Sequence, residues 1–286
     1  MGSTTLAFKY NSFVVSLYNA FLNNLCRGVE AFIFVASTGR CGTVSLADIL
    51  RAADKAICLH EPYPTMINLF AEPHTFQKDF EYRFNTRKRI NVKQAAVGFR
   101  YYIETNHLFI NNFACYAAKE FGRKLKVIHL RRDPVKVATS FFRINSIPGI
   151  TPRGKEYLLD PLNKNNIVLL TDLFQGNSEF NHPLYRCLWY WYEVEARIWY
   201  FKNQFPQIST YRLSTEELNE ETKLTDMFNT LGIEYDQDEL LKRVGTHANS
   251  RNWEKNITDD IRAASEMNEN LMNIISSRYQ LNFLEK

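Results

Sequence analysis

The chain has 286 residues, of which 45% are hydrophobic and 23% are charged, with a formal net charge of +4. This composition is typical of a soluble globular protein, and the length is sufficient to bury one large core. We therefore expect residues 1–286 to form a single domain, and the charge is too small to indicate a nucleic-acid partner.

Five cysteines are scattered along the chain without C-x-x-C pairs. This spacing argues against a disulfide framework and against a zinc site, and it suits a reducing compartment. No apolar run is long enough to span a bilayer. We expect a cytoplasmic protein with no bound metal and no integral membrane segment.

The N-terminal segment, residues 1–30, contains an aromatic-rich stretch interrupted by polar residues such as Lys9 and Asn19. It lacks the basic start and the uninterrupted apolar run of a signal peptide. We expect an amphipathic helix that packs on the domain, and the alternative is loose association with a membrane.

Residues 32–50 combine an apolar β-branched run, a turn of small residues with two glycines, and apolar residues at helical spacing. A strand, a glycine turn and a helix N-terminus together favour anions, because the N–H groups of the turn point inward and the helix adds positive potential. The alternative is a turn that only connects the strand to the helix. We predict that the turn binds phosphate through Thr38, Gly39, Arg40, Cys41, Gly42, Thr43, Val44 and Ser45.

This turn differs from the loop of nucleotide hydrolases. The Walker A pattern needs four residues between its glycines and a lysine after the second one. Here only two residues separate Gly39 from Gly42, and threonine follows Gly42. No predicted strand ends in an aspartate that would hold magnesium.

Two further strands are expected at residues 56–59 and 96–103. The first ends at His60 and Glu61, and ionisable groups at the carboxyl end of a strand in an open parallel sheet lie where ligands bind. The alternative is that Glu61 only caps the turn and that His60 is an ordinary, partly buried histidine.

Residues 125–143 repeat the pattern of a buried strand followed by a helix. Asp133 is suited to the N-cap and Pro134 to the first turn of that helix. Arg132 lies just before the helix and Ser140 about two turns along it. A guanidinium and a hydroxyl in this arrangement predict a second anion site, and the alternative is a helix cap with a surface serine.

Together, the two segments resemble the sulfotransferase family, whose members use 3′-phosphoadenosine 5′-phosphosulfate (PAPS). Residues 40–44 resemble the family's 5′-phosphosulfate loop, commonly [KR]-S-G-T-T, with Cys41 and Val44 as departures. Arg132 and Ser140 match the family's 3′-phosphate motif. The resemblance implies a P-loop-like α/β fold, with a central parallel sheet flanked by helices. It also implies PAPS as cosubstrate, 3′-phosphoadenosine 5′-phosphate (PAP) as product, and no metal.

The resemblance also implies catalytic residues. In tyrosylprotein and several bacterial sulfotransferases, a catalytic glutamate follows the phosphate loop at the distance of Glu61, which makes Glu61 the expected general base, with His60 beside it. In the cytosolic branch the base belongs to a Lys-Thr-His group, which matches residues 100–102 here and leaves the histidine missing. Arg100 is then expected to stabilise the transferring sulfonate, and His107 is the rival base.

The acceptor site is expected in the second half of the chain. Residues 144–184 are loop-rich and are predicted to be a lid over that site. Residues 185–201 form an aromatic helix of a kind that borders the acceptor pocket in the family, although such a stripe is more often core. The acceptor-site candidates are Tyr102, Trp191, Tyr192 and Glu193, and carboxylates at 193 and 195 would favour a cationic acceptor.

A strand at 208–213 precedes Thr215, which replaces the family's adenine-adjacent tyrosine. Residues 247–256 resemble the family's C-terminal segment but lack the basic pair that clamps the 3′-phosphate. Arg251 is expected to substitute for that pair.

We therefore predict a sulfotransferase that moves a sulfonate group from PAPS to a hydroxyl, amine or carbamoyl nitrogen of a small molecule. The sequence resembles bacterial natural-product sulfotransferases, including cyanobacterial enzymes that tailor saxitoxin. One alternative is a P-loop nucleotide kinase or NTPase, which would bind ATP with Mg²⁺. Another is a non-catalytic PAP(S)-binding relative, because of Cys41, Val44 and the altered clamp. No feature of the sequence indicates an oligomeric state.

Overall fold

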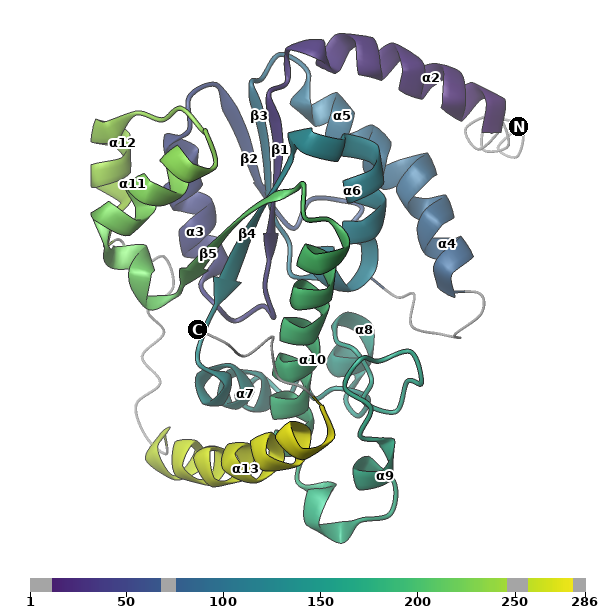
Figure 1. The fold of residues 1–286 in the computed structure, drawn as a ribbon, viewed down its shortest axis with the longest axis vertical. Coiled ribbons are helices and arrows are strands. Elements are labelled where there is room, and N and C mark those ends of the chain that lie inside the picture. Colours follow the sequence, from purple (N-terminus) through teal and green to yellow (C-terminus); the bar gives the residue numbers. More distant parts are fainter. Residues whose placement is uncertain (1–11, 68–75, 246–256, 280–286) are drawn as a thin grey trace.

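The centre of the molecule is a sheet of five parallel strands in the order β2-β3-β1-β4-β5. The structure is a computed structural model that describes residues 12–67, 76–245 and 257–279. Since the strands are parallel, their carboxyl ends meet at one edge of the sheet, which faces α7 and α13 in Figure 1. The strands are β1 (Ala31–Ala36), β2 (Ala56–His60), β3 (Tyr101–Thr105), β4 (Leu125–Arg131) and β5 (Ser209–Ser214).

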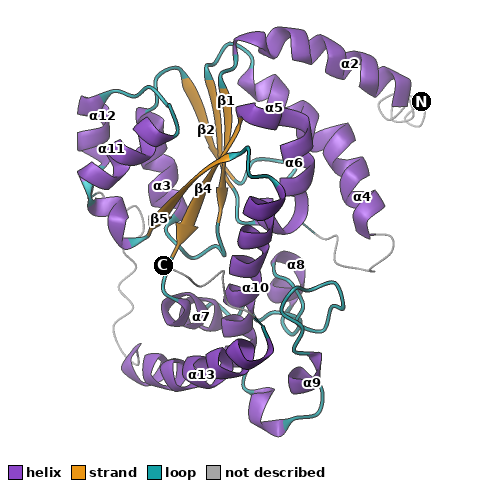
Figure 2. Cartoon of the chain, in the orientation of Figure 1, coloured by secondary structure: helices purple, strands orange, loops and turns teal. Residues whose placement is uncertain are grey.

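Helices flank the sheet on both sides (Figure 2). In the first half of the chain they are α2 (Ser12–Leu25), α3 (Thr43–Ile49), α4 (Phe76–Arg83), α5 (Arg89–Ala96), α6 (Ala114–Phe121) and α7 (Pro134–Arg143), with π-helical turns at Phe84–Lys88 and Phe109–Phe113. In the second half they are α8 (Pro152–Tyr157), α9 (Thr171–Phe174), α10 (Pro183–Gln204), α11 (Glu221–Thr230), α12 (Gln237–Arg243) and α13 (Ile257–Arg278). This arrangement confirms the predicted α/β fold with a central parallel sheet.

The central strand β1 explains why the sheet forms around residues 31–36. All six of its residues are buried, as expected for an apolar run in a parallel sheet covered on both faces. Phe32 pairs in register with Tyr102 of β3 and with Leu125 of β4. The loop after β1 therefore emerges in the middle of the carboxyl edge, where ligands bind in such sheets.

Helix α7 starts as its sequence predicts. The Asp133 carboxylate accepts a hydrogen bond of 2.9 Å from the Lys136 amide, and Pro134 occupies the first turn. This helix packs against α10 and α13 beyond the carboxyl edge of the sheet. The cap fixes the position of Arg132, which immediately precedes it.

One strand boundary differs from the prediction. The segment expected to be a strand at 96–103 begins with the last residue of α5, and the chain then turns at Gly98, whose φ is +86°. The strand itself is Tyr101–Thr105. Because of this shift, the carboxyl end of β3 carries Thr105 and the following His107 instead of residues 100–102.

Candidate active site

The turn between β1 and α3, residues 37–42, is the first component of the site. Gly39, Arg40 and Gly42 have φ values of +77°, +57° and +84°. A tight turn with left-handed residues resembles the turns in which successive backbone N–H groups form an anion-binding nest. Helix α3 begins directly after Gly42 and points its N-terminus at the same place.

The side chains of Thr38 and Cys41 point into this turn and hold its shape. The Thr38 hydroxyl donates to the carbonyl of Gly39 at 2.8 Å and lies 2.9 Å from the sulfur of Cys41. Burial raises the pKa of the Cys41 thiol to about 12, so the thiol stays neutral. Both residues therefore build the loop, and the side chains of Thr43, Val44 and Ser45 at the start of α3 are more exposed.

The second anion motif is joined directly to this turn. The Arg132 guanidinium donates to the carbonyl of Arg40 at 2.9 Å. The Arg40 Nε in turn donates to the hydroxyl of Ser140 on α7 at 2.9 Å. The structure thus brings together three residues that the sequence placed in two separate motifs.

A cavity of about 270 Å³ lies beside the turn. It is lined by Gly42, Ser45, Ile49, Arg132, Thr215, Glu216, Leu218, Asn219, Arg243 and Gly245. The Thr215 hydroxyl donates to the carbonyl of Cys41 at 2.8 Å and so ties the wall of the cavity to the loop. Arg243, which the sequence analysis did not select, also lines the cavity and pairs with Asp48 of α3 at 2.9 Å.

Glu61 and His107 meet at the carboxyl ends of the neighbouring strands β2 and β3. The Nδ1 of His107 lies 2.7 Å from Oε1 of Glu61. The hydrogen bond from His107 is the main reason why the pKa of Glu61 is lowered, so the carboxylate is ionised and Nδ1 is the donor. The His107 ring also borders the turn at residues 37–42, because a Cβ added at Gly39 would lie 3.4 Å from it.

Three other side chains surround this pair. His60 is exposed, and its Nδ1 lies 2.7 Å from the Thr105 hydroxyl. From α8, the Tyr157 ring lies 6.3 Å from the His107 ring, and the guanidinium of Arg153 lies over Tyr157 at 5.6 Å. The charges of His60 and Arg153 also contribute to the lowered pKa of Glu61. Segment 144–184 therefore borders the pair, although its role as a lid stays a prediction.

Arg100 does not belong to this site. It precedes β3 at the amino edge of the sheet, about 16 Å from the carboxyl edge for a strand of this length. Its guanidinium is held by Glu30 at 2.7 Å, by Asp54 at 3.3 Å and by Glu234. This corrects the expectation that Arg100 stabilises a transferring sulfonate, and the cause is the misplaced start of the strand.

The acceptor-site candidates on β3 and α10 have other partners. Tyr102 is buried and donates to Glu104 at 2.6 Å. Trp191 donates to the carbonyl of Arg132 at 2.8 Å, and Tyr192 donates to Asn268 of α13 at 2.9 Å. These contacts place the three side chains in the core, although Trp191 supports the backbone of Arg132.

The carboxylates of α10 are also engaged. Glu193 is fully buried, pairs with Arg197 at 2.6 Å and accepts from the amide of Val168 at 2.8 Å. Glu195 pairs with His129 at 3.1 Å and with Arg131. Neither carboxylate is open to a cationic acceptor, which corrects that expectation. Arg251 lies outside the described residues.

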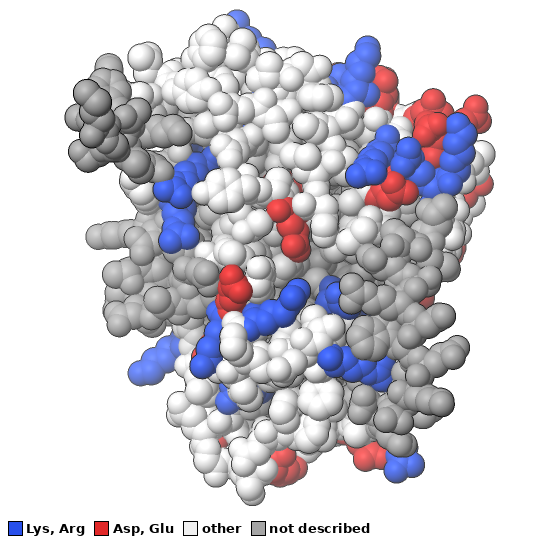
Figure 3. Space-filling model, turned by 180° about the vertical axis from the view of Figure 1, so that it is seen from behind, with Lys and Arg blue, Asp and Glu red and all other residues white. Residues whose placement is uncertain are grey.

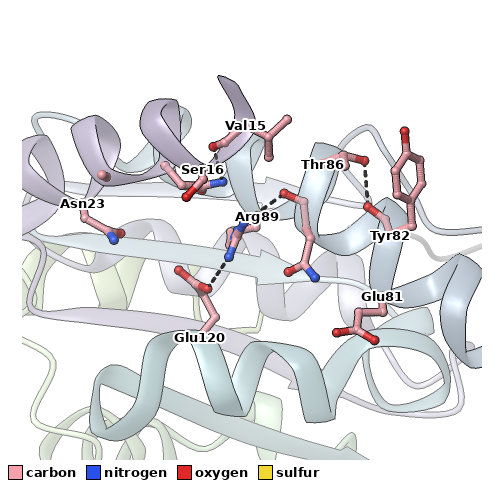
Figure 4. Close-up of a pocket in the computed structure, with 11 residues that line it drawn as sticks. Val15, Ser16, Asn23, Glu81, Tyr82, Thr86, Arg89 and Glu120 are labelled. Atoms are coloured by element: carbon pink, nitrogen blue, oxygen red, sulfur yellow. Dashed lines mark hydrogen bonds and ion pairs between the residues drawn. The ribbon is translucent and has the colours of Figure 1, made fainter. Parts of the chain in front are cut away.

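A second cavity, of about 660 Å³, lies between α2 and the helices α4 and α5 (Figure 4). In its wall Arg89 pairs with Glu120 of α6 at 2.9 Å. Glu120 also pairs with Lys93, which donates to Asn23 of α2 at 2.6 Å. These residues come from elements on the side of the molecule away from the turn between β1 and α3.

Seen from behind, basic and acidic side chains lie intermixed at the upper right, and several basic side chains, with an acidic one beside them, lie across the lower centre (Figure 3). Among the described residues, no group of three or more His, Cys, Asp or Glu side chains has the arrangement of a metal site. Within the same part of the chain, no helix has the length and apolar character needed to cross a membrane.

A scan of the sequence against family models and a search of curated proteins found no match. Among the solved structures that are similar to this chain are three with TM-scores below 0.5. A sulfotransferase domain from the curacin biosynthetic pathway has a TM-score of 0.48 and 17% identity, over 75% of this chain and 78% of that one. A sulfotransferase from Alicyclobacillus acidocaldarius has a TM-score of 0.42 and 14% identity, over 84% of this chain and 95% of that one. Retinol dehydratase in complex with androsterone and PAP has a TM-score of 0.39 and 15% identity, over 90% of this chain and 84% of that one.

Proposed function

We propose that this protein transfers the sulfonate group of PAPS to a hydroxyl or nitrogen of a small-molecule acceptor. The observation that carries the proposal is the junction between the two anion motifs. Arg132 reaches across 92 positions of sequence to the carbonyl of Arg40, and Arg40 reaches Ser140. Two phosphate-binding groups at one place suit a nucleotide that carries phosphate at both its 5′ and 3′ positions.

The residues at the carboxyl edge fit such a nucleotide. The N–H groups of residues 39–43 and the Arg40 side chain would hold the 5′-phosphosulfate. Arg132 and Ser140 would hold the 3′-phosphate. The Nε of Arg132 is buried and has no partner among the described residues, so a phosphate oxygen would satisfy it. The cavity beside Thr215 and Arg243 would take the adenine side, and Arg251 stays a candidate for the phosphate clamp.

PAPS supplies an activated sulfonate, whose sulfur bonds to the acceptor atom as the bond to the leaving phosphate oxygen breaks. The residues of this chain position the reactants and compensate charge, as in phosphoryl transfer. The ionised Glu61 accepts from Nδ1 of His107, which leaves Nε2 of the ring to take the acceptor's proton. Glu61, expected from sequence to be the base itself, then orients the histidine that acts as the base, and His60 lies beside them.

A thermal-unfolding experiment with PAP, ADP and ATP–Mg²⁺ tests the cosubstrate. A ligand at a hundred times its Kd stabilises the folded state by about 2.7 kcal/mol, which raises Tm measurably. We expect a much larger shift with PAP than with ADP. A shift only with ATP–Mg²⁺ would favour the kinase alternative, and the absence of any shift would refute the proposal.

Release of PAP from PAPS, measured with a panel of hydroxyl- and amine-bearing metabolites, tests the transfer. We expect release that depends on the acceptor. If PAP binds but no acceptor in the panel causes PAP to be released from PAPS, the non-catalytic alternative is favoured. The natural-product context is part of this proposal, but the paired state of Glu193 and Glu195 gives no support to a guanidinium acceptor of the saxitoxin type.

A further inference from the structure

A buried polar cluster, formed by Lys88, Tyr102, Glu104 and Asn106, lies next to the Glu61–His107 pair. The Nζ of Lys88 is 2.6 Å from Oε1 of Glu104, and the two side chains are 1% and 0% exposed. Tyr102 donates to the other oxygen of Glu104 at 2.6 Å. Asn106 donates to Oε1 of Glu104 at 2.9 Å. The carboxylate thus accepts from three donors in the interior of the protein.

Such a cluster is not explained by stability alone. Removing an ammonium and a carboxylate from water costs more than their attraction returns unless every remaining hydrogen bond is made, and apolar side chains of similar size are often equally stable there. The three donors on Glu104 satisfy that condition, and the ammonium of Lys88 also lies over the Phe113 ring at 5.2 Å. The position of the cluster suggests what else it does.

The cluster contacts the backbone next to both members of the catalytic pair. The Nζ of Lys88 donates to the carbonyl of Pro62 at 3.4 Å, directly after Glu61. On the other side, the Asn106 oxygen accepts from the amide of Leu108 at 3.0 Å, so its side chain spans His107. One carboxylate, Glu104, therefore anchors both contacts.

Glu61 requires support of this kind. Its φ is +45°, a conformation that a residue with a side chain adopts at a cost and that persists only where its surroundings enforce it. Its amide donates to the carbonyl of Thr105 at 3.1 Å, and the contact of Lys88 with Pro62 holds the following residue. A small rotation at this turn would separate the Glu61 carboxylate from His107.

We propose that Lys88, Glu104 and Asn106 are positioning residues that hold Glu61 and His107 at hydrogen-bond distance and so keep the proton on Nδ1 of His107. This inference rests on the proposed function, because the pair has a catalytic role only if proton transfer occurs there. The three residues touch no reactant and act through Glu61 and His107 alone.

The readout is the tautomer of His107, measured from the ¹⁵N chemical shifts of its ring in alkaline buffer, where imidazole rings are neutral. The signal is assigned by its loss in His107→Asn. Two variants each remove one of the two links between the cluster and the pair: Asn106→Ala breaks the link to Leu108, and the double variant Lys88→Met/Glu104→Gln removes the link to Pro62. The double variant removes both charges together, so it leaves no unpaired buried ion that would prevent folding.

The matched control is Lys93→Met/Glu120→Gln at the second cavity. Lys93 lies on the helix that follows Lys88 and is 4% exposed, and its partner Glu120 is 17% exposed and also pairs with Arg89. The control therefore removes a buried ion pair away from the site and disturbs the local charges at least as much as the test variant does. Circular dichroism and thermal unfolding establish that each variant is folded.

In the wild type and the control, we expect the Nδ1–H tautomer of His107 to predominate. In each test variant we expect a mixture of tautomers, and a kcat for PAP release that is lower by ~10-fold or more while KM for PAPS stays within about twofold. Wild-type tautomers in both test variants would overturn the inference, as would an equal change in the control. A failure of PAP to bind the wild type would refute the proposed function instead, and the tautomer measurement would still decide whether the cluster positions the pair.

Discussion

The two edges of the sheet both carry charged residues, but those residues are arranged differently. At the amino edge, Arg100 is surrounded by Glu30, Asp54 and Glu234, and all three nitrogens of its guanidinium donate hydrogen bonds to these carboxylates. At the carboxyl edge, the Nε of Arg132 lacks a partner among the described residues. Charge alone therefore does not distinguish the two edges, and the Nε of Arg132 is a buried donor that a bound anion could satisfy.

The backbone differs between the edges as well. At the carboxyl edge, Gly39, Arg40, Gly42 and Glu61 have positive φ and lie around one place. At the amino edge, Lys55 and Gly98 also have positive φ, of +48° and +86°, and a Cβ at Gly98 would meet nothing within 4 Å. The difference is that the positive-φ residues of the carboxyl edge surround the His107 ring and the turn after β1, whereas those of the amino edge lie in the turns that lead into β2 and β3.

The largest expected effect comes from breaking the pair at the carboxyl edge. We expect His107→Ala to lower kcat by ~10²–10⁴, since a general base contributes about that factor. Glu61→Gln should lower kcat less, but by at least ~10-fold, because the amide still contacts the ring while the charge is lost. The measurement is PAP release at saturating PAPS. A larger loss in Glu61→Gln than in His107→Ala would make Glu61 the base, as the sequence alone suggested.

Arg132→Ala tests the incompletely satisfied donor. Hydrogen bonds to charged groups contribute about 1.5–3 kcal/mol, so we expect the Kd for PAP to rise roughly 10- to 150-fold. Titration calorimetry with PAP and with ADP checks this, and the Kd for ADP should change little because it lacks the 3′-phosphate. Equal losses for PAP and ADP would place Arg132 elsewhere on the nucleotide.

Gly42 at the carboxyl edge and Gly98 at the amino edge both have positive φ, so alanine substitutions at the two positions can be compared directly. Alanine in the left-handed conformation costs about 1–2 kcal/mol, and we expect both Gly42→Ala and Gly98→Ala to lower the free energy of unfolding by about that amount. Gly42→Ala should cost more, because its Cβ would lie 3.1 Å from Leu218. It should also reduce the Tm increase given by PAP, whereas Gly98→Ala should leave that increase intact. An equal PAP response in the two variants would contradict the assignment of the turn.

The smallest expected effect concerns how the carboxyl groups at each edge of the sheet make Tm depend on pH. The pKa of Glu61 is lowered from 4.5 by its hydrogen bond with His107, and those of Glu30 and Glu234 are lowered by Arg100. A carboxyl with a lowered pKa stabilises the fold above its unfolded value and loses that contribution as the pH falls through the folded value. Tm should therefore depend less on pH below 4.5 in both Glu61→Gln and Arg100→Met.

The value of kcat distinguishes Glu61→Gln from Arg100→Met. Arg100→Met removes contacts only at the amino edge, so we expect kcat and the Kd for PAP to equal those of the wild type. A loss of turnover in a folded Arg100→Met would restore the catalytic role that the sequence suggested and the structure argues against.

Much of the local structure follows from residues that are close in the sequence. Short apolar runs predicted β1, β2, β4 and β5 to within two residues at either end. The central strands β1 and β4 are mostly buried, as expected for parallel strands covered on both faces, whereas the edge strands β2 and β5 are mostly only partly buried. Asp133 and Pro134 predicted the start of α7, since a helix cap is decided within four residues. The glycines of the turn predicted a bend that only their conformational freedom allows.

The start of β3 could not be predicted in the same way. Residues 96–103 are apolar and aromatic enough for a strand, yet α5 continues to Ala96 and Gly98 then turns the chain. The register against β1 and β2 decides which end of β3 faces the ligand, and it places Tyr101 first and Thr105 last. An error of five residues therefore moved the expected catalytic group from one edge of the sheet to the other.

The sequence by itself determined the α/β alternation and the two anion motifs, because strands, caps and turns depend on short-range sterics and burial. Only the tertiary structure decided which side chains meet. Glu61 and His107 are 46 positions apart, and Arg40 and Ser140 are 100 apart. Their contacts depend on strand order and register, which are set by the packing of the whole sheet. The same packing placed Lys88 against Glu104 and directed Glu193 into the core.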